Sequence, residues 1–361
     1  MRSSRVADVG AQTTYWFYKR MIHIAVIGAG RWGPNIINNL EAGSRSLVRY
    51  VVDKDEQRLS EIQKRFPAVI AIADPKIAFD DPEIDAVVIA TPTSTHYELV
   101  TQALNSGKHV FVEKPLTHSV DTSKKISTLA KEVDRIVMVG HVFVYNSASR
   151  KVRELVQQGA LGRIYYLSMV RTNLGPIRVD VDAAWDLAAH DISMANFWLD
   201  ALPLSVSAAS GTFINDGVAD VVFANIRYPN DILVSIHASW LNPAKARDIT
   251  VVGEKKMLTF DDVDLETPIR IFDKQVKERA ESPEMIGTFE SFRTSVHEGG
   301  MTTPFVEKTQ PLRNECDHFI DCLENGAICE SDPTAGINVV RVLEAISMSA
   351  QAGCEVAIGD V

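Results

Sequence analysis

The chain has 361 residues, of which 46% are hydrophobic and 23% charged, values typical of a globular protein of two domains. Its net charge of −10 is opposite in sign to that expected of a protein that binds nucleic acid or an anionic membrane surface. The strongest apolar run, 86–90, ends at Thr91-Pro92, far short of the roughly 20 apolar residues that a spanning helix needs, so a transmembrane protein is excluded as well.

Residues 1–20 carry four basic side chains but lack the apolar core of a secretory signal peptide. They are interpreted either as a disordered extension or as the product of a start codon chosen too far upstream, with Met21 as the natural first residue. In both cases the fold is expected to begin near Met21.

Residues 21–140 alternate short apolar runs with longer amphipathic segments, the pattern of a parallel sheet covered by helices on both faces. The expected strands are Ile22–Ile27, Leu47–Val52, Ala86–Ala90, His109–Val112 and Ile136–Val139. The expected helices are Pro34–Leu40, Glu56–Arg65, Tyr97–Ser106 and Thr122–Val133. The prediction is a Rossmann-like, doubly wound α/β domain.

Residues 141–361 predict a second, α+β domain with a large, open and mostly antiparallel sheet, which binds substrate and forms oligomers. Its expected strands are Ile164–Thr172, Ser205–Phe213, Ala219–Tyr228, Ile232–Trp240 and Asp248–Gly253. Its expected helices are Ala148–Gln158, Asn314–Asn325 and Ala335–Ser349, the last of which could pack back on the first domain. For the polar segment Lys274–Gln310 no conformation is predicted.

The four cysteines, at positions 316, 322, 329 and 354, include no Cys-x-x-Cys pair. This spacing argues against a zinc site and against a disulfide framework. We therefore expect no metal, and reduced, buried thiols in a cytoplasmic protein.

A Gly-x-Gly-x-x-Gly motif at residues 28–33 directly follows the first predicted strand and directly precedes a helix. In that context the first glycine permits a tight turn, the second lets the main chain approach a pyrophosphate, and the third lets helix and strand pack closely. The expected cofactor contacts in this motif are Gly28, Gly30, Arg31, Trp32 and Gly33.

Asp53 ends the second predicted strand, where its carboxylate can accept hydrogen bonds from an adenosine ribose. This favours NAD, because a 2′-phosphate about 4 Å away would be repelled by roughly 4 kcal/mol per unit charge at intermediate dielectric. Arg49, Lys54 and Arg58 could offset part of that repulsion, so NADP stays possible; Asp53 could also be a simple turn residue.

Two further loops follow strands at the same edge of the sheet, where ligands of open parallel sheets bind. From these loops we expect cofactor contacts by Thr91, Pro92, Thr93, His96, Glu113 and Lys114. Thr95 is interpreted as a helix cap, and His96 could instead cover the start of the helix. Lys114, between Glu113 and Pro115 at the end of a buried strand, is expected to point into the ligand crevice.

The glycine-rich loop, the Thr-Pro loop and the Glu-Lys-Pro loop, in this order, resemble those of the Gfo/Idh/MocA oxidoreductase family. The resemblance extends to about residue 350 and includes Gly162-Arg163-Ile164 and the segment Trp185–Asp191. It implies that Lys114, Asp186 and His190 are catalytic.

Asp186 and His190 are four residues apart, so on a helix they would share one face. Oxidation of a secondary alcohol removes a hydride and a proton, and the site therefore needs a base and a group that stabilises alkoxide character. We expect His190 to accept the proton, Lys114 to donate a hydrogen bond to the reacting oxygen, and Asp186 to orient His190 or a substrate hydroxyl. The roles of Lys114 and His190 could be inverted.

Besides these three residues, the expected substrate contacts are Tyr145, Asn146, Arg171, Asn173 and Arg178, with the arginines gripping a diphosphate or carboxylate. Either arginine could instead pair with a neighbour such as Asp180 or Asp182. The segments resemble the nucleotide-sugar branch, which implies oxidation at C3 of a substrate such as UDP-N-acetylglucosamine. The alternatives are a dehydrogenase of a free sugar or polyol of the inositol type, and a catalytically inactive NAD-binding sensor.

The open antiparallel sheet has one face for helices and one left over. The strands within 205–253 are therefore expected to bury the second face against another subunit, giving a homodimer or homotetramer.

Overall fold

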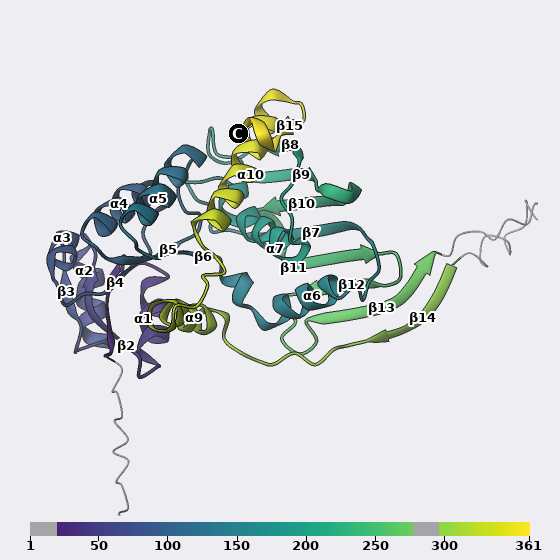
Figure 1. The fold of residues 1–361 in the computed structure, drawn as a ribbon. Coiled ribbons are helices and arrows are strands. Elements are labelled where there is room, and N and C mark those ends of the chain that lie inside the picture. Colours follow the sequence, from purple (N-terminus) through teal and green to yellow (C-terminus); the bar gives the residue numbers. More distant parts are fainter. Residues whose placement is uncertain (1–19, 277–295) are drawn as a thin grey trace, which may run out of the picture.

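The computed structural model describes residues 20–276 and 296–361, which form two β-sheets with helices around and between them (Figure 1). The expected extension, residues 1–20, lies outside this part of the chain except for Arg20. Arg20 is an exposed residue whose guanidinium lies 3.4 Å from the carboxylate of Asp85.

The first sheet has six parallel strands in the order β3-β2-β1-β4-β5-β6. They are β1 (Ile22–Ile27), β2 (Ser46–Val52), β3 (Ile70–Ile72), β4 (Ala86–Ile89), β5 (His109–Glu113) and β6 (Val137–Gly140). The predicted doubly wound parallel sheet is thereby confirmed. Since the order reverses between β1 and β4, a crevice is expected beyond the carboxyl ends of these central strands.

Helices cover both faces of this sheet, and each face has its own apolar core. They are α1 (Gly33–Glu41), α2 (Glu56–Arg65), α3 (Pro75–Asp80), α4 (His96–Asn105) and α5 (Val120–Glu132). Strand β3 and helix α3 were not predicted, because three and six residues are too few to establish a period.

The second sheet has nine strands in the order β14-β13-β12-β11-β7-β10-β9-β8-β15, and all neighbours are antiparallel except β7 and β10. They are β7 (Ile164–Leu174), β8 (Ser205–Gly211), β9 (Val221–Arg227), β10 (Leu233–Ser239), β11 (Leu241–Gly253), β12 (Met257–Asp261), β13 (Ile269–Val276), β14 (Val296–Thr302) and β15 (Val356–Ala357). The expected open, mostly antiparallel sheet is confirmed. Strands β12 to β15 were not predicted, and β14 lies within the segment for which no conformation was proposed.

Four longer helices complete the described chain: α6 (Ser147–Gln157), α7 (Ala189–Leu199), α9 (Pro311–Asn325) and α10 (Pro333–Ala352). Helix α10 joins the two halves, because Val340 belongs to the core of the first sheet while Leu343 belongs to that of the second. Helix α9 covers the same face of the first sheet as α1, with Phe319 in their shared core.

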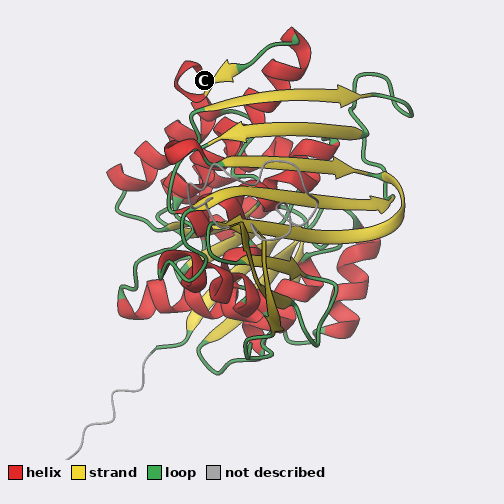
Figure 2. Cartoon of the chain, turned by 90° about the vertical axis from the view of Figure 1, so that its right-hand side faces the viewer, coloured by secondary structure: helices red, strands yellow, loops and turns green. Residues whose placement is uncertain are grey.

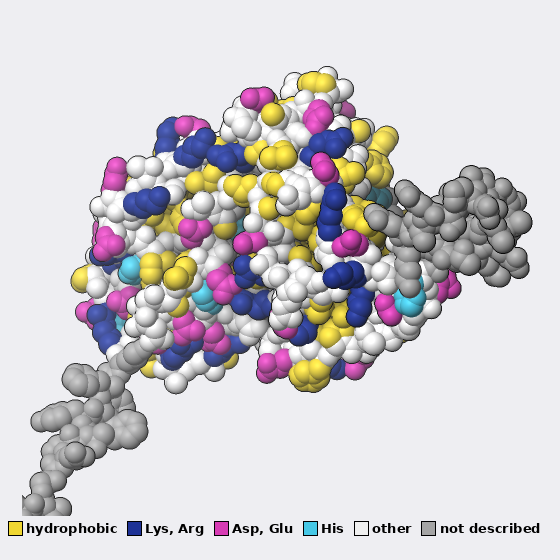
Figure 3. Space-filling model, turned by 45° about the vertical axis from the view of Figure 1, so that its right-hand side comes forward, with side chains coloured by type: hydrophobic (Ala, Val, Ile, Leu, Met, Phe, Trp, Pro, Cys, Tyr) yellow, Lys and Arg dark blue, Asp and Glu magenta, His cyan; other side chains and the backbone are white. Residues whose placement is uncertain are grey.

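One face of the second sheet packs on helices and the other is open (Figure 2). The strands alternate accordingly: Val222, Ala224 and Ile226 of β9 are buried, whereas Phe223 between them is 52% exposed. On this side of the molecule hydrophobic side chains are interspersed with charged ones (Figure 3).

All four cysteines are free. Cys316 and Cys322 are buried as expected, but Cys329 is only partly buried and Cys354 is exposed, so the expectation of buried thiols was wrong for the last. Within residues 20–276 and 296–361, no helix combines the length and the apolar character needed to cross a bilayer.

Candidate active site

The turn between β1 and α1 is shaped by two glycines that no other residue could replace without displacing the backbone. Gly28 has φ = +105°, and a Cβ added there would lie 2.5 Å from the backbone oxygen of Ala90. A Cβ on Gly33 would lie 2.2 Å from the oxygen of Gly28. These contacts hold the turn closely over the first sheet.

Gly30 differs from both, because a Cβ there would meet nothing nearer than the Arg58 guanidinium at 3.8 Å. The first turn of α1 has no side-chain cap, with Pro34 near its start, and Arg31 and Trp32 are exposed. An open approach beside Gly30 and uncapped amide groups at a helix start fit the pyrophosphate of a dinucleotide.

Asp53, directly after β2, is hydrogen-bonded to this turn. Its carboxylate accepts hydrogen bonds from the amides of Ala29 at 2.8 Å and Asp55 at 2.9 Å. The Arg58 guanidinium lies 3.7 Å from the same carboxylate, whereas Arg49 pairs with Asp81 instead. The edge of the nucleotide crevice therefore carries an acid with a cation beside it.

His96 occupies a buried position between the two loops that follow β4 and β5. One ring nitrogen lies 2.9 Å from the oxygen of Pro115 and the other 3.0 Å from that of Thr91. Burial lowers the pKa of His96. A neutral ring has one N–H, so His96 donates to one of these two carbonyl oxygens and lies against the other. It is thus packed between the two loops, and its contact with the cofactor stays a prediction.

The Thr-Pro loop is also held internally. The hydroxyl of Thr95 donates to the oxygen of Pro92 and lies 2.7 Å from that of Thr91, so it does not cap α4 as expected. Thr93 is buried in the same short turn. This loop is fixed at the edge of the crevice by its own hydrogen bonds.

Lys114, which follows β5, reaches the segment that leads into α7. Its ammonium donates to the backbone oxygen of Asp186 at 2.6 Å and lies 3.5 Å from the carboxylate of the same residue. Burial lowers the pKa of Lys114, although Asp186 and Glu113 oppose this effect. Burial also raises the pKa of Glu113 to about 7.

Asp186 lies in a π-helical turn, Ala184–Ala188, that runs directly into α7. Such turns are rare and occur often at functional sites. Burial opposes ionisation of Asp186, but Lys114 and Arg178 outweigh it and lower its pKa. The carboxylate therefore stays charged between two cations, and the Arg178 guanidinium donates to it at 3.0 Å.

His190, at the start of α7, is a neutral imidazole. Burial first, and then the charges of Lys114 and Arg171, place its pKa well below the ordinary value. Its Nδ1 is buried and has no hydrogen-bond partner among the described residues. The ring of Phe143 packs edge-on against it at 5.1 Å between centroids. A neutral imidazole with a ring nitrogen that makes no hydrogen bond, near the Lys114 ammonium, is suited to proton transfer.

All five further residues expected to bind substrate have hydrogen-bond or ion-pair partners within the fold. Arg171 forms a buried ion pair with Asp191 at 2.8 Å, rather than with Asp180 or Asp182. Asn146 caps α6 by accepting from Ala148, and the buried hydroxyl of Tyr145 lies 2.8 Å from that of Ser331.

Asn173 lies between Arg247, which donates to its side-chain oxygen, and the backbone oxygen of Gly175. Arg178 forms ion pairs with both Asp180 and Asp186. The alternative expectation, that it pairs with a neighbour such as Asp180, is thus met, and through Asp186 it also borders the candidate site. Of the five, Arg178 donates a hydrogen bond to Asp186, one of the three residues expected to be catalytic.

His141 was not singled out from the sequence, although it directly follows β6 and so stands at a strand end like Lys114. Both its ring nitrogens are buried without a partner among the described residues, and burial and Lys114 lower its pKa to about 4. It lines a cavity of about 490 Å³ that continues along Asn196 and Phe197 to Glu330 and Asn338. A smaller hollow of about 220 Å³ lies beside Asp180 and Trp185.

Comparison with known protein families gives two matches. Residues 22–141 match the model described as oxidoreductase family, NAD-binding Rossmann fold, of the GFO/IDH/MocA group. Residues 149–259 match the model of the GFO/IDH/MocA C-terminal domain.

Three curated relatives act on different compounds according to their names. The chain is 28% identical to myo-inositol 2-dehydrogenase of Thermotoga maritima (70% of this chain, 79% of the relative) and 30% identical to scyllo-inositol 2-dehydrogenase (NAD(+)) of Bacillus subtilis (62% and 69%). It is 27% identical to UDP-N-acetylglucosamine 3-dehydrogenase of Acidithiobacillus ferrooxidans (67% and 75%).

Among solved structures, GenD2 from gentamicin A biosynthesis, in complex with NAD, superposes with a TM-score of 0.78 at 22% identity, covering 98% of this chain and 99% of that one. This likeness concerns the fold.

Proposed function

The chain belongs to the Gfo/Idh/MocA family of NAD-binding oxidoreductases, and on that premise we propose that it oxidises a secondary hydroxyl group of a sugar or polyol at the site of Lys114, Asp186 and His190. Bound NAD, held at the turn around Gly30 and Asp53, supplies the hydride acceptor. In this proposal residues 21–140 bind the cofactor and residues 141–361 contribute the substrate-binding surface.

The observation that carries the proposal is the contact of the Lys114 ammonium with the oxygen of Asp186, on the segment that also presents the neutral imidazole of His190. Proton removal from a hydroxyl needs an unprotonated base, and His190 supplies one at neutral pH. The lysine then donates a hydrogen bond to the oxygen as negative charge develops on it. Asp186, held by Lys114 and Arg178, positions the ammonium group.

Two substrates compete within this class. A nucleotide-linked amino sugar such as UDP-N-acetylglucosamine, oxidised at C3, needs cations for its diphosphate, and Arg171 and Arg178 were the candidates for them. The pairing of Arg171 with buried Asp191, and of Arg178 with two carboxylates, leaves neither charge uncompensated. This favours an uncharged polyol or free sugar, for which hydroxyl recognition suffices.

The test is a dehydrogenase assay with NAD against myo-inositol, scyllo-inositol, UDP-N-acetylglucosamine and its uronic acid. Turnover of the inositols alone supports a polyol substrate. Turnover confined to the nucleotide sugars supports a nucleotide-sugar substrate instead. NAD binding without turnover of any sugar or polyol would indicate a sensor and contradict the enzyme proposal.

His190→Ala is expected to lower kcat by about 10²–10⁴-fold, the usual contribution of acid–base catalysis. The control is His297→Ala, which removes an imidazole on β14 that pairs with Asp273 far along the second sheet. If both variants turn over substrate at the same rate, His190 is not the base.

A further inference from the structure

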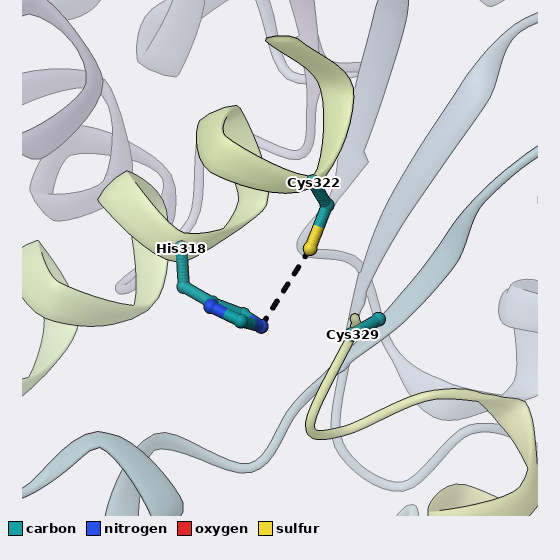
Figure 4. A group of neighbouring side chains, drawn as sticks. All are labelled: His318, Cys322 and Cys329. Atoms are coloured by element: carbon teal, nitrogen blue, oxygen red, sulfur yellow. Dashed lines mark hydrogen bonds between the residues drawn. The ribbon is translucent and has the colours of Figure 1, made fainter. Parts of the chain in front are cut away.

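Three side chains of types that can bind a metal ion converge beside helix α9, which covers one face of the first sheet. His318 and Cys322 lie one turn apart on α9, and Cys329 lies on the loop between α9 and α10 (Figure 4). Their ligand atoms all lie within 4.8 Å of one another. The expectation of no metal rested on the absence of a Cys-x-x-Cys pair, whereas the fold adds His318, one turn before Cys322, and Cys329 from the following loop.

One pair of ligand atoms has the separation found in a tetrahedral zinc site. The sulfur of Cys322 lies 3.6 Å from Nε2 of His318. With zinc–sulfur bonds of about 2.3 Å and zinc–nitrogen bonds of about 2.0 Å, two ligands of a tetrahedral ion lie roughly 3.5 Å apart. The helix therefore already presents two ligand atoms at the separation that the ion requires.

One of the three ligand atoms has a neighbour that an ion could replace. The backbone amide of Glu330 lies 3.2 Å from Nε2 of His318 and donates to it. A metal ion would take the place of that amide, whose group is exposed and can bind water instead.

We propose that His318, Cys322 and Cys329 bind one Zn²⁺ ion, with a water molecule in the fourth position. Two thiolates and an imidazole select a thiophilic divalent cation over magnesium or calcium, which prefer oxygen ligands. Two thiolates also neutralise the charge of the ion. This proposal is independent of the dehydrogenase activity.

The ion would fix the loop between α9 and α10 to helix α9. Ser331 lies two residues after Cys329. Its backbone oxygen accepts from the amide of Val139 in β6 at 2.8 Å, and the Ser331 hydroxyl contacts the hydroxyl of Tyr145. Glu330 and Ser331 also line the cavity that His141 enters. The loop thus forms one wall of that cavity, and metal binding would stabilise the wall.

The experiment uses the full chain, reduced and freed of metal with a chelator, and titrates it with Co²⁺ as a spectroscopic probe, followed by Zn²⁺. One equivalent of Co²⁺ should produce a thiolate-to-cobalt charge-transfer band and the visible bands of tetrahedral cobalt, and Zn²⁺ should displace it. Cys322→Ser and Cys329→Ser should each weaken or abolish the charge-transfer band. Cys354→Ser, which removes an exposed thiol outside the cluster, should leave it unchanged.

A second measurement needs no variant. Hydrogen exchange of the Val139 amide in the unmodified protein should slow when Zn²⁺ is added, because the loop that protects this amide is then held in place. Absence of the cobalt band in the reduced protein would overturn the proposal, as would its persistence in the Cys322→Ser/Cys329→Ser double variant. A Cys322–Cys329 disulfide in protein that takes up no metal when reduced would assign the pair to thiol oxidation and also overturn it.

Discussion

Asp53 and Arg58 set the charge beside the ribose end of the nucleotide crevice. The carboxylate of Asp53 is fixed by two amides and would repel a 2′-phosphate, whereas the Arg58 guanidinium at 3.7 Å would attract one. The fixed acid favours NAD, and the more exposed arginine moderates that preference. The preference for NAD over NADP should therefore depend on a single charge.

Asp53→Asn is expected to raise the ratio of kcat/KM with NADP to kcat/KM with NAD by about tenfold, a change of about 1.4 kcal/mol. The asparagine oxygen can still accept from Ala29, while the hydrogen bond from the Asp55 amide is lost and the repulsion is removed. Asp55→Asn is the control, because it removes a charge nearby and keeps the cap of α2. An unchanged ratio in Asp53→Asn would show that Asp53 does not face the ribose.

Glu113 links the site to the pH dependence of stability, since burial raises its pKa to about 7 from an ordinary value of 4.5. The folded protein therefore binds this proton more tightly than the unfolded chain does. The resulting contribution to stability is complete below about pH 4.5 and is lost as pH rises through about 7.

Glu113→Gln, which mimics the protonated acid, is expected to make the free energy of unfolding fall less steeply between about pH 4.5 and 7 than in the parent protein. Urea unfolding across that range measures the difference. Glu61→Gln, on an exposed position of α2, should keep the parent slope. Equal slopes for the parent and Glu113→Gln would mean that the buried carboxyl is charged at all these pH values.

At the scale of elements, the turn between β1 and α1 separates two uses of glycine. Gly28 and Gly33 are required by contacts within the fold, whereas nothing in the fold fills the space beside Gly30. Gly30 is thus the glycine of the motif whose lack of a side chain matters for the ligand and not for the fold.

Gly28→Ala is expected to lower the thermal midpoint, because the positive φ and the 2.5 Å approach to Ala90 strain any side chain there. Gly30→Ala should leave the midpoint within a few degrees but raise the KM for NAD about tenfold or more, since its methyl group would keep the pyrophosphate from the backbone. Calorimetry and steady-state kinetics on the pair separate the two effects. A Gly30→Ala variant with an unaltered KM would place the phosphates elsewhere.

At the scale of the whole molecule, the open face of the second sheet exposes a row of apolar side chains on neighbouring strands. Phe223 stacks on His237 at 4.4 Å, and Tyr166 and Leu233 face each other across β7 and β10. All but His237 are more than two-fifths exposed. An apolar face of this kind indicates association, and we propose that two or four copies of the chain assemble through it.

Phe223→Glu should therefore convert the dimer or tetramer to monomers at micromolar concentration, as measured by light scattering. The charge would have to be desolvated in the interface, which is costly without a partner. Ile77→Glu, an equally exposed apolar position on α3 of the first sheet, should leave the mass unchanged. A parent chain that is monomeric from the outset would contradict the proposed assembly.

The sequence by itself determined the elements whose signal is local. Long apolar or alternating runs predicted the central strands of both sheets, and the glycine motif predicted the turn at Gly28. Short strands such as β3 and β15 were not predicted, because two or three residues show no hydrophobic periodicity and these strands are stabilised by their neighbours in the sheet.

The roles of long polar side chains were decided by the tertiary structure, since their partners are distant in the chain. Arg171 pairs with Asp191, Tyr145 with Ser331, and His96 with two loop carbonyls, where sequence position suggested ligand contacts. The buried, unpartnered His141 and the cluster around Cys322 arise in the same way. The burial of a polar side chain and its hydrogen-bond or ion-pair partners depend on which distant segments the fold brings together. A local sequence pattern does not contain that information.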